Sequence, residues 1–407
     1  MSRKNSKKNL TVENLDSDST ISTLDSIFDS INPGYGSLLS NDDYLTTSDW
    51  ISTGSYTLNA LISSSLFKGI PSGKVTVFSG ESASGKTLLA LNTCREAIKK
   101  GYMVLWCDTE NAIEKEQVKS LGIDPKMFRH QRFSTNTIEE LTTYLVNVFA
   151  KLKELKNSKK SSENKKIMIV IDSIGQLPSQ KEMLDSLSGS DKVDMTRAKM
   201  LKRLFRVITS DIAYLDIPVL MINHIYANVG SFIGGNVQSG GSGPMFSASI
   251  IVEFSKAQLK MDEDSSKRTG TIVTAKLIKG RFSTVGAKKK IHISFKNGVN
   301  PYIGLQSFMN PEFYERTGIG FGKIDKSDGS FIQTTNKDDI TKQGYVINGN
   351  SVKYNNFFLH SVFNDDVLKV LDEYAQDELK FKNDNYSNDD IENDIDNETN
   401  VEEITEE

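Results

Sequence analysis

The chain has 407 residues, of which 49 are Lys or Arg and 53 are Asp or Glu, so its formal net charge is −4. With 25% charged and 37% hydrophobic residues, its composition is that of a globular protein and excludes collagen-like, coiled-coil and wholly disordered chains. The length predicts two or three domains.

The sequence contains no segment that is typical of a membrane protein or a secreted protein. Its longest aliphatic run, Ile167–Ile171, is far shorter than the roughly 20 apolar residues of a membrane-spanning helix. The basic N-terminus is not followed by an apolar segment, as a secretory signal would be. The two cysteines, Cys94 and Cys107, cannot build a disulfide framework. We therefore expect a reduced, cytoplasmic protein with no membrane partner.

The N-terminal arm, residues 1–48, is polar and rich in Ser and Asp. Within it, Leu24, Ile27, Phe28 and Ile31 recur at the spacing of one helical face. This pattern predicts a short amphipathic helix that needs an apolar surface to pack on, and a neighbouring copy of the chain could supply that surface.

The core, residues 49–305, alternates short apolar runs with helical patterns. The runs predict buried strands at Val75–Ser79, Met103–Cys107, Ile167–Asp172 and Val219–Asn223. The helical patterns cover Thr87–Lys99, Ile138–Leu155 and Met195–Ile208. Such alternation is typical of an α/β fold with a central, mostly parallel sheet covered on both faces.

Two further segments follow the core. Residues 306–383 lose the alternation and predict a small C-terminal domain that ends in a helix near Asp365–Leu379. The last segment, residues 384–407, holds eleven acidic residues and no Lys or Arg, so we expect a disordered acidic tail. Without it the net charge of the chain becomes +7. The tail is either a solubiliser or a polyanion that competes with nucleic acid for a basic surface.

The segment between the first core strand and the next helix carries a phosphate-binding loop. It satisfies the pattern G-x-x-x-x-G-K-[ST] with Gly80, Glu81, Ser82, Ala83, Ser84, Gly85, Lys86 and Thr87. Backbone N–H groups of such a loop and the following helix N-terminus bind phosphates. We expect Lys86 to reach the β- and γ-phosphates of ATP and the Thr87 hydroxyl to bind Mg²⁺.

Two acidic residues follow other core strands. Asp172 ends the strand Ile167–Asp172, which is the Walker B arrangement that holds Mg²⁺. Glu110 lies just after the strand Met103–Cys107 and is a candidate general base for activating water. The alternative interpretation of Glu110 is a helix-capping acid.

Several motifs together resemble one family of ATPases. Ser52-Thr53-Gly54, the phosphate loop and Asp108-Thr109-Glu110 resemble the RecA recombinase core. The chain resembles more specifically the UvsX recombinases of T4-like phages in three further segments, Asp194–Arg206, Asn223-His224 and Gly240–Met245. The resemblance covers roughly residues 50–305.

The resemblance implies a RecA-type core and a DNA-dependent ATPase that uses ATP and Mg²⁺. Such a protein forms a helical filament on single-stranded DNA and catalyses pairing and strand exchange with homologous duplex DNA. It also implies mediator proteins and single-strand-binding proteins as partners, and the host cytoplasm as location if a phage encodes the chain.

The resemblance also assigns further residues to the ATP site. His224 stands at the position of the γ-phosphate sensor that couples nucleotide state to the DNA-binding loop. Lys279 and Arg281 match two basic residues that reach the ATP site of the adjacent subunit. Where the family stacks a Tyr on adenine, this chain has Gln117.

The predicted helix 195–208 and two loops are the candidate DNA surface. By pattern alone, the basic helical face is a solvated surface, but by resemblance Lys199, Lys202 and Arg206 contact the DNA backbone. Residues 178–193 correspond to the first DNA-binding loop. The Gly-rich second loop, residues 225–242, predicts phosphate contacts and apolar residues that wedge between bases. Its candidate DNA-binding residues are Val229, Phe232, Gly240, Gly241 and Ser242.

Two other functions remain open. A hexameric DNA helicase with the same core fold would carry a separate N-terminal domain, for which residues 1–48 are too short and too polar. A filament-forming DNA-binding protein with little turnover would use ATP only as an assembly switch, and Glu110 argues against that function.

Overall fold

The computed structural model describes residues 17–31, 46–158, 166–188, 196–227, 236–238, 248–257, 270–294, 298–334 and 344–380. The chain divides into two units, residues 1–49 and 50–407. The first unit contains α1 (Ser17–Ile31), so the predicted amphipathic helix is confirmed. The side chains of Leu24, Ile27, Phe28 and Ile31 on it are 48% to 76% exposed. Within the described ranges, no helix has the length and apolarity needed to span a membrane.

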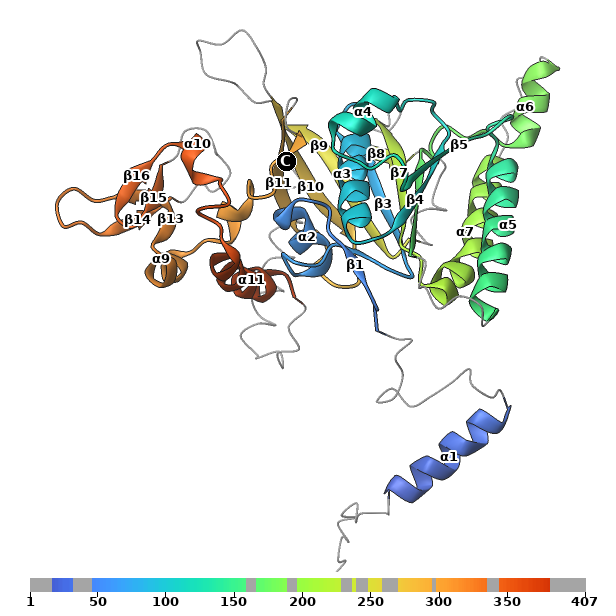
Figure 1. Ribbon diagram of the computed structural model, residues 1–407, viewed down its shortest axis with the longest axis horizontal. Helices are drawn as coiled ribbons and strands as arrows, with labels where there is room; N and C mark the ends of the chain where they lie inside the picture. The colour runs from blue at the N-terminus through green and yellow to red at the C-terminus, as the bar shows by residue number, and fades with distance from the viewer. Residues whose placement is uncertain are drawn as a thin grey trace, which may run out of the picture. The chain divides into compact units, whose positions relative to one another are not determined.

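The second unit is built on a ten-stranded sheet, counted over the described residues (Figure 1). Nine strands follow the order β12-β11-β10-β9-β3-β7-β6-β4-β5, and β8 pairs with β7. The six strands from β9 to β5 are parallel, and the remaining pairs are antiparallel. The strands are β3 (Val75–Gly80), β4 (Met103–Asp108), β5 (Phe128–Arg132), β6 (Ile167–Asp172), β7 (Val219–Ala227), β8 (Asn236–Gln238), β9 (Ile250–Ala257), β10 (Gly270–Lys279), β11 (Lys288–Ser294) and β12 (Gly298–Val299).

Helices cover both faces of this sheet, as the alternating pattern predicts. On one face, α3 (Lys86–Lys99) packs through Leu89 and Cys94 against Phe78 and Trp106. On the other face, α5 (Ile138–Asn157) and α7 (Thr196–Leu215) lie side by side (Figure 1). Their buried side chains pack against a second set of strand residues and include Leu145, Phe149, Leu204, Phe205 and Ile208. The expected α/β class is therefore confirmed.

Smaller elements complete this part of the chain. Before the phosphate loop, β1 (Trp50–Ile51) pairs with β2 (Ile70–Pro71), and α2 (Tyr56–Ser63) lies between them in sequence. A short helix, α4 (Lys115–Ser120), follows β4.

The structure corrects the predicted end of one helix and the predicted extent of two loops. The helix expected to end at Ile208 continues to Leu215, because Ile212 extends its buried face. The first expected DNA-binding loop, residues 178–193, contains a helix, α6 (Gln180–Leu187), which begins with a capping box between Ser179 and Glu182. The second, residues 225–242, contains the end of β7 and all of β8, and Ile225 pairs with Gln238.

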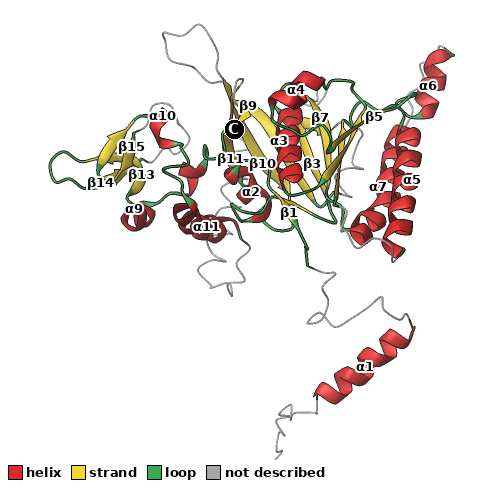
Figure 2. Ribbon diagram, in the orientation of Figure 1, coloured by secondary structure: helices red, strands yellow, loops and turns green. Residues whose placement is uncertain are grey.

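Over its described residues, the C-terminal region has its own four-stranded sheet, in the order β14-β13-β15-β16 (Figure 2). Its strands are β13 (Ile319–Ile324), β14 (Phe331–Gln333), β15 (Tyr345–Ile347) and β16 (Asn350–Val352). The helices are the 3-10 helix η3 (Leu305–Phe308), α9 (Pro311–Thr317), α10 (Tyr354–Phe357) and α11 (Asp365–Leu379), and α11 has the predicted bounds.

Helix α11 is tied to the segment that follows α2 and to the turn that follows β10. The buried carboxylate of Asp372 accepts hydrogen bonds from the backbone N–H of Leu66 and the hydroxyl of Ser65. The hydroxyls of Ser64 and Thr284 both donate to the carbonyl of Leu379. The proposed domain boundary at residue 305 stays a prediction, and the acidic tail lies outside the described residues.

Candidate active site

The parallel strands bring several predicted site residues to one edge of the sheet. Gly80 at the end of β3 pairs with His224 of β7, and Asp108 at the end of β4 pairs with Asp172 of β6. The carboxyl ends of parallel strands meet at the same edge, which is where ligands bind in α/β sheets. The phosphate loop, Glu110, Asp172 and His224 therefore share this edge.

Glycine is required at both ends of the phosphate loop. Gly80 and Gly85 have φ angles of 154° and 87°. A Cβ atom on Gly80 would lie 2.3 Å from the carbonyl oxygen of Phe254, and one on Gly85 would lie 2.4 Å from Cδ1 of Ile293. The loop between them leads into the N-terminus of α3, whose free N–H groups and dipole favour phosphate. The local backbone thus fits the predicted nucleotide site.

Lys86 is held beneath the loop. Its side chain is buried, and its Nζ donates to the carbonyl oxygens of Gly80 and Glu81 at 2.9 and 2.7 Å. Burial lowers the pKa of Lys86 to about 8, and the positive charge of Lys256 on β9 contributes in the same direction, against the opposing effect of Asp172 and Glu110. The ammonium group is therefore partly desolvated, which strengthens its attraction for phosphate.

Thr87 and Asp172 fit a Mg²⁺ site. The Thr87 hydroxyl donates to Oδ2 of Asp172 at 3.0 Å. Oδ1 of Asp172 is buried and has no hydrogen-bond partner among the residues that the structure describes. Burial, followed by the charge of Glu110, raises the pKa of Asp172 to about 7. A hydroxyl and a buried carboxylate are oxygen ligands that Mg²⁺ accepts, and the ion usually takes few protein ligands besides phosphate and water.

Glu110 is a hydrogen-bonded carboxylate beside the loop. Its Oε1 accepts from Nε2 of His224 at 2.6 Å and also from the hydroxyl of Ser173. The bond from His224 is the largest cause of the lowered pKa of Glu110 and outweighs the effect of burial. Glu110 does not cap a helix, because α4 begins at Lys115 and its N-cap is Glu114. The role of general base stays a prediction.

The turn that carries Glu110 is fixed by Asp108. Oδ1 of this buried carboxylate accepts from the backbone N–H groups of Glu110 and Asn111, at 3.1 and 2.7 Å. Its Oδ2 accepts from Nε2 of His130, on β5, at 2.8 Å. Three residues of this cluster were not predicted from the sequence: His130, Ser173 as a partner of Glu110, and Lys256. The sequence of β5, Phe-Arg-His-Gln-Arg, has no apolar alternation that would have aligned it with β4.

Other predicted ATP-site residues are not brought to this cluster. Lys279, at the end of β10, pairs with Ile251 of β9, whereas the phosphate loop begins beside Phe254 of the same strand. Three residues of strand correspond to about 10 Å, toward the opposite edge of the sheet. Arg281 follows Lys279, and Gln117 lies on the exposed side of α4. The predicted role of Lys279 and Arg281 concerns the ATP site of an adjacent subunit, and that of Gln117 concerns the adenine base.

The candidate DNA-binding residues of α7 lie on its exposed side. Lys199, Lys202 and Arg206 are exposed, whereas Leu201, Leu204 and Phe205 are buried. The start of α7 is anchored by Arg197, whose Nε donates to the carbonyl of Leu177 at 2.8 Å. The predicted residues Val229, Phe232, Gly240, Gly241 and Ser242 lie outside the described residues.

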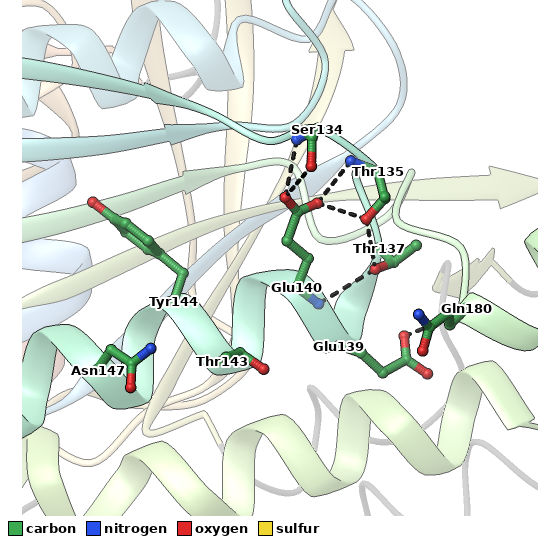
Figure 3. Close-up of a pocket in the computed structure, with 9 residues that line it drawn as sticks. All are labelled: Ser134, Thr135, Thr137, Glu139, Glu140, Thr143, Tyr144, Asn147 and Gln180. Atoms are coloured by element: carbon green, nitrogen blue, oxygen red, sulfur yellow. Dashed lines mark hydrogen bonds between the residues drawn. The ribbon is translucent and has the colours of Figure 1, made fainter.

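A shallow hollow of about 500 Å³ lies along the first half of α5 (Figure 3). Glu140 at its rim accepts hydrogen bonds from the backbone and hydroxyl groups of Ser134 and Thr135. These bonds outweigh the effect of burial and lower the pKa of Glu140 to about 2. The hollow shares no residue with the phosphate loop, and its carboxylates already accept hydrogen bonds from the chain. It is therefore not the nucleotide site.

The sequence matches known proteins over the part that forms this site. The family model of the RecA N-terminal domain matches residues 22–300. The "Recombination and repair protein" of Enterobacteria phage T4 is 29% identical over 269 residues, which cover 66% of this chain and 65% of the phage protein. "Protein RecA" of Treponema denticola is 26% identical over 300 residues, which cover 73% of this chain and 68% of the relative. "Protein RecA" of Wolinella succinogenes is 27% identical over 292 residues, which cover 71% of this chain and 74% of the relative. The match thus spans slightly under two thirds of the phage protein's length.

The raised pKa of Asp172, about 7 against an ordinary value of 3.8, gives a prediction for the protein without nucleotide or Mg²⁺. Between these two values the folded state binds a proton that the unfolded state has lost, so this contribution to stability is full below about pH 4 and is lost as the pH rises through about 7. The substitution Asp172→Asn removes the ionisable group, so the stability of this variant does not fall as the pH rises through about 7. Its amide oxygen can still accept the hydrogen bond from the Thr87 hydroxyl. Its free energy of unfolding should exceed that of the wild type by roughly 1 to 3 kcal/mol at pH 8 and equal it near pH 4.

Urea unfolding at several pH values in the presence of EDTA measures this difference. Asp124→Asn, on an exposed loop, is the matched control and should show no such trend. A gain in Asp172→Asn that is the same at every pH would contradict the burial of an ionised carboxylate.

Proposed function

Because the chain belongs to the family of the RecA N-terminal domain, we propose that it is a recombination and repair protein. In this proposal it is a DNA-dependent ATPase that assembles as a filament on single-stranded DNA and catalyses homologous pairing and strand exchange. The observation that carries the proposal is the contact between Glu110 and His224, placed beside the phosphate loop at the carboxyl edge of the sheet. It joins the predicted hydrolytic base to a strand that leads toward the predicted second DNA loop.

ATP binding is assigned to the loop and the residues around it. The backbone N–H groups of residues 80–87 and Lys86 hold the phosphates, and Thr87 and Asp172 hold Mg²⁺. When bound, Mg²⁺ neutralises charge that develops on the phosphate oxygens. Glu110, whose lowered pKa keeps it ionised at neutral pH, accepts a proton from the attacking water. Its partners Ser173 and His224 orient the carboxylate.

His224 links this chemistry to DNA. It lies in β7, directly before the predicted second DNA loop, residues 225–242, whose first three residues are the end of this strand. A γ-phosphate that accepts a hydrogen bond from His224 and draws its imidazole away from Glu110 shifts the end of this strand. Binding of DNA is assigned to that loop and to Lys199, Lys202 and Arg206 on the exposed side of α7.

The first experiment measures ATP hydrolysis with and without single-stranded DNA, followed by strand exchange between a circular single strand and a linear duplex. We expect hydrolysis to be stimulated by the DNA. Glu110→Gln should lower turnover by about 100-fold or more while ATP still binds, and it should trap the ATP-bound filament. Glu114→Gln, in the same loop but without a side-chain capping bond, should turn over normally.

Hydrolysis that ignores single-stranded DNA would refute the proposed function. Hydrolysis coupled to duplex unwinding without strand exchange would favour a helicase, and DNA-dependent assembly with negligible turnover would favour a nucleotide-gated filament. Normal turnover of Glu110→Gln would remove Glu110 from the mechanism.

The basic face of α7 gives a second prediction. Replacing Lys199, Lys202 and Arg206 together with Gln should weaken single-stranded DNA binding and reduce the salt dependence, −d log K/d log[salt], by about 2, since each lost phosphate contact on a single strand contributes about 0.7. Fluorescence anisotropy at several salt concentrations measures both effects. Replacing the exposed Lys99, Lys119 and Lys151 instead removes the same charge elsewhere. An equal loss in this control would mean that net charge, and not α7, determines binding.

Self-association is assigned to α1. Its exposed apolar side chains, Leu24, Ile27, Phe28 and Ile31, need a partner surface, and we propose that an adjacent copy of the chain supplies it. Deleting residues 1–35 should leave a folded core that does not polymerise, as electron microscopy and light scattering would show. Phe28→Asp should have the same effect, whereas Ser30→Asp, away from the apolar stripe, should not. Filaments of normal length from the deletion would contradict this assignment.

A further inference from the structure

Asp108 is a buried carboxylate that has no direct place in the proposed chemistry. Its side chain is 1% exposed, and it lies opposite Asp172 in the sheet. Such a group is costly to bury unless hydrogen bonds compensate its charge. Asp108 obtains them from two backbone N–H groups on one oxygen and from one imidazole on the other.

The two N–H groups belong to Glu110 and Asn111, so Asp108 determines the course of the turn that presents Glu110. Asn111 has a φ angle of 54°, which allows the chain to reverse there. Thr109, which precedes Glu110, is held by other contacts. Its N–H donates to the carbonyl of Asp172, and its hydroxyl donates to the carbonyl of Ser173. The backbone of Glu110 itself depends on Asp108.

His130 fixes the orientation of that carboxylate. With both N–H groups on Oδ1, rotation of the carboxyl group is restrained from one side, and the bond from Nε2 of His130 to Oδ2, at 2.8 Å, restrains it from the other. The imidazole projects from the edge strand β5, and its side chain is 35% exposed. Exposed positions tolerate substitution better than buried ones, so His130 is a better site for a test than Asp108.

We propose that His130 is a positioning residue for ATP hydrolysis, which holds Asp108 so that the turn keeps the Glu110 carboxylate against Ser173 and His224. This inference rests on the proposed function, because it assumes that Glu110 activates water. Lys86 and Thr87 make none of these contacts and bind the phosphates from another loop. The loss of His130 should therefore affect the chemical step and not the binding of ATP.

The test measures kcat, KM and nucleotide affinity of the full-length chain with single-stranded DNA. His130→Ala should lower kcat by about tenfold, since a displacement of about 1 Å at a catalytic group costs up to 100-fold. KM and the affinity for a fluorescent ATP analogue should stay within about twofold. His130→Gln keeps a donor that reaches Asp108 and should recover most of kcat. Arg129→Ala, at the preceding exposed position of β5, should behave as the wild type.

The outcomes separate this inference from the function on which it rests. If wild-type hydrolysis is stimulated by DNA but His130→Ala keeps its kcat within about twofold, only the role of His130 is refuted. A loss of kcat that His130→Gln does not recover, or a parallel loss of nucleotide affinity, would show a general structural role and would also refute it. A wild type without DNA-stimulated hydrolysis refutes the proposed function, and the inference with it.

Discussion

Three carboxylates at one edge of a buried sheet set the conditions for the rest of the site. Asp108, Glu110 and Asp172 are brought together because β4 and β6 are parallel and in register, and their charges repel one another in a poorly solvated place. The chain compensates each of them differently. Asp108 receives two N–H groups and an imidazole, and Glu110 receives a hydroxyl and a second imidazole. Asp172 receives one hydroxyl, and within the described part of the chain one of its oxygens has no partner.

This unequal compensation suits the three acids to the different roles proposed for them. The groups with the most hydrogen bonds are held in fixed orientations, as a positioned base and its support require. The group with the fewest is the one whose pKa is raised, so a divalent cation beside it relieves a cost already present in the folded chain. Covering helices on both faces keep the supporting strands buried, which makes the edge rigid.

Local patterns predicted much of this arrangement. The phosphate loop, Asp172 and the helix Asp365–Leu379 were readable because spacing and apolar runs alone determine them. Helix α6 was also readable, since Ser179 and Glu182 form a capping box, but the family resemblance assigned this segment to a DNA-binding loop. The contact between Asp108 and His130 could not be predicted, because it depends on the register of the polar strand β5, which no local pattern encodes. The pairing of β8 with β7 likewise joins residues across a Gly-rich segment.

The antiparallel pairing of β7 with β8 makes the end of β7 part of a ribbon, not a free chain end. A hydrogen-bonded ribbon resists stretching, so in the proposed function a displacement at His224 is passed on toward Ala227. Thermodynamic linkage makes this transmission reciprocal. A ligand that binds beyond Ala227 and moves the ribbon changes the free energy of the contact between Glu110 and His224. In turn, a change in this contact alters the binding free energy of that ligand by the same amount. In the proposed function, the ribbon therefore couples the nucleotide at one end to a ligand bound beyond Ala227 at the other.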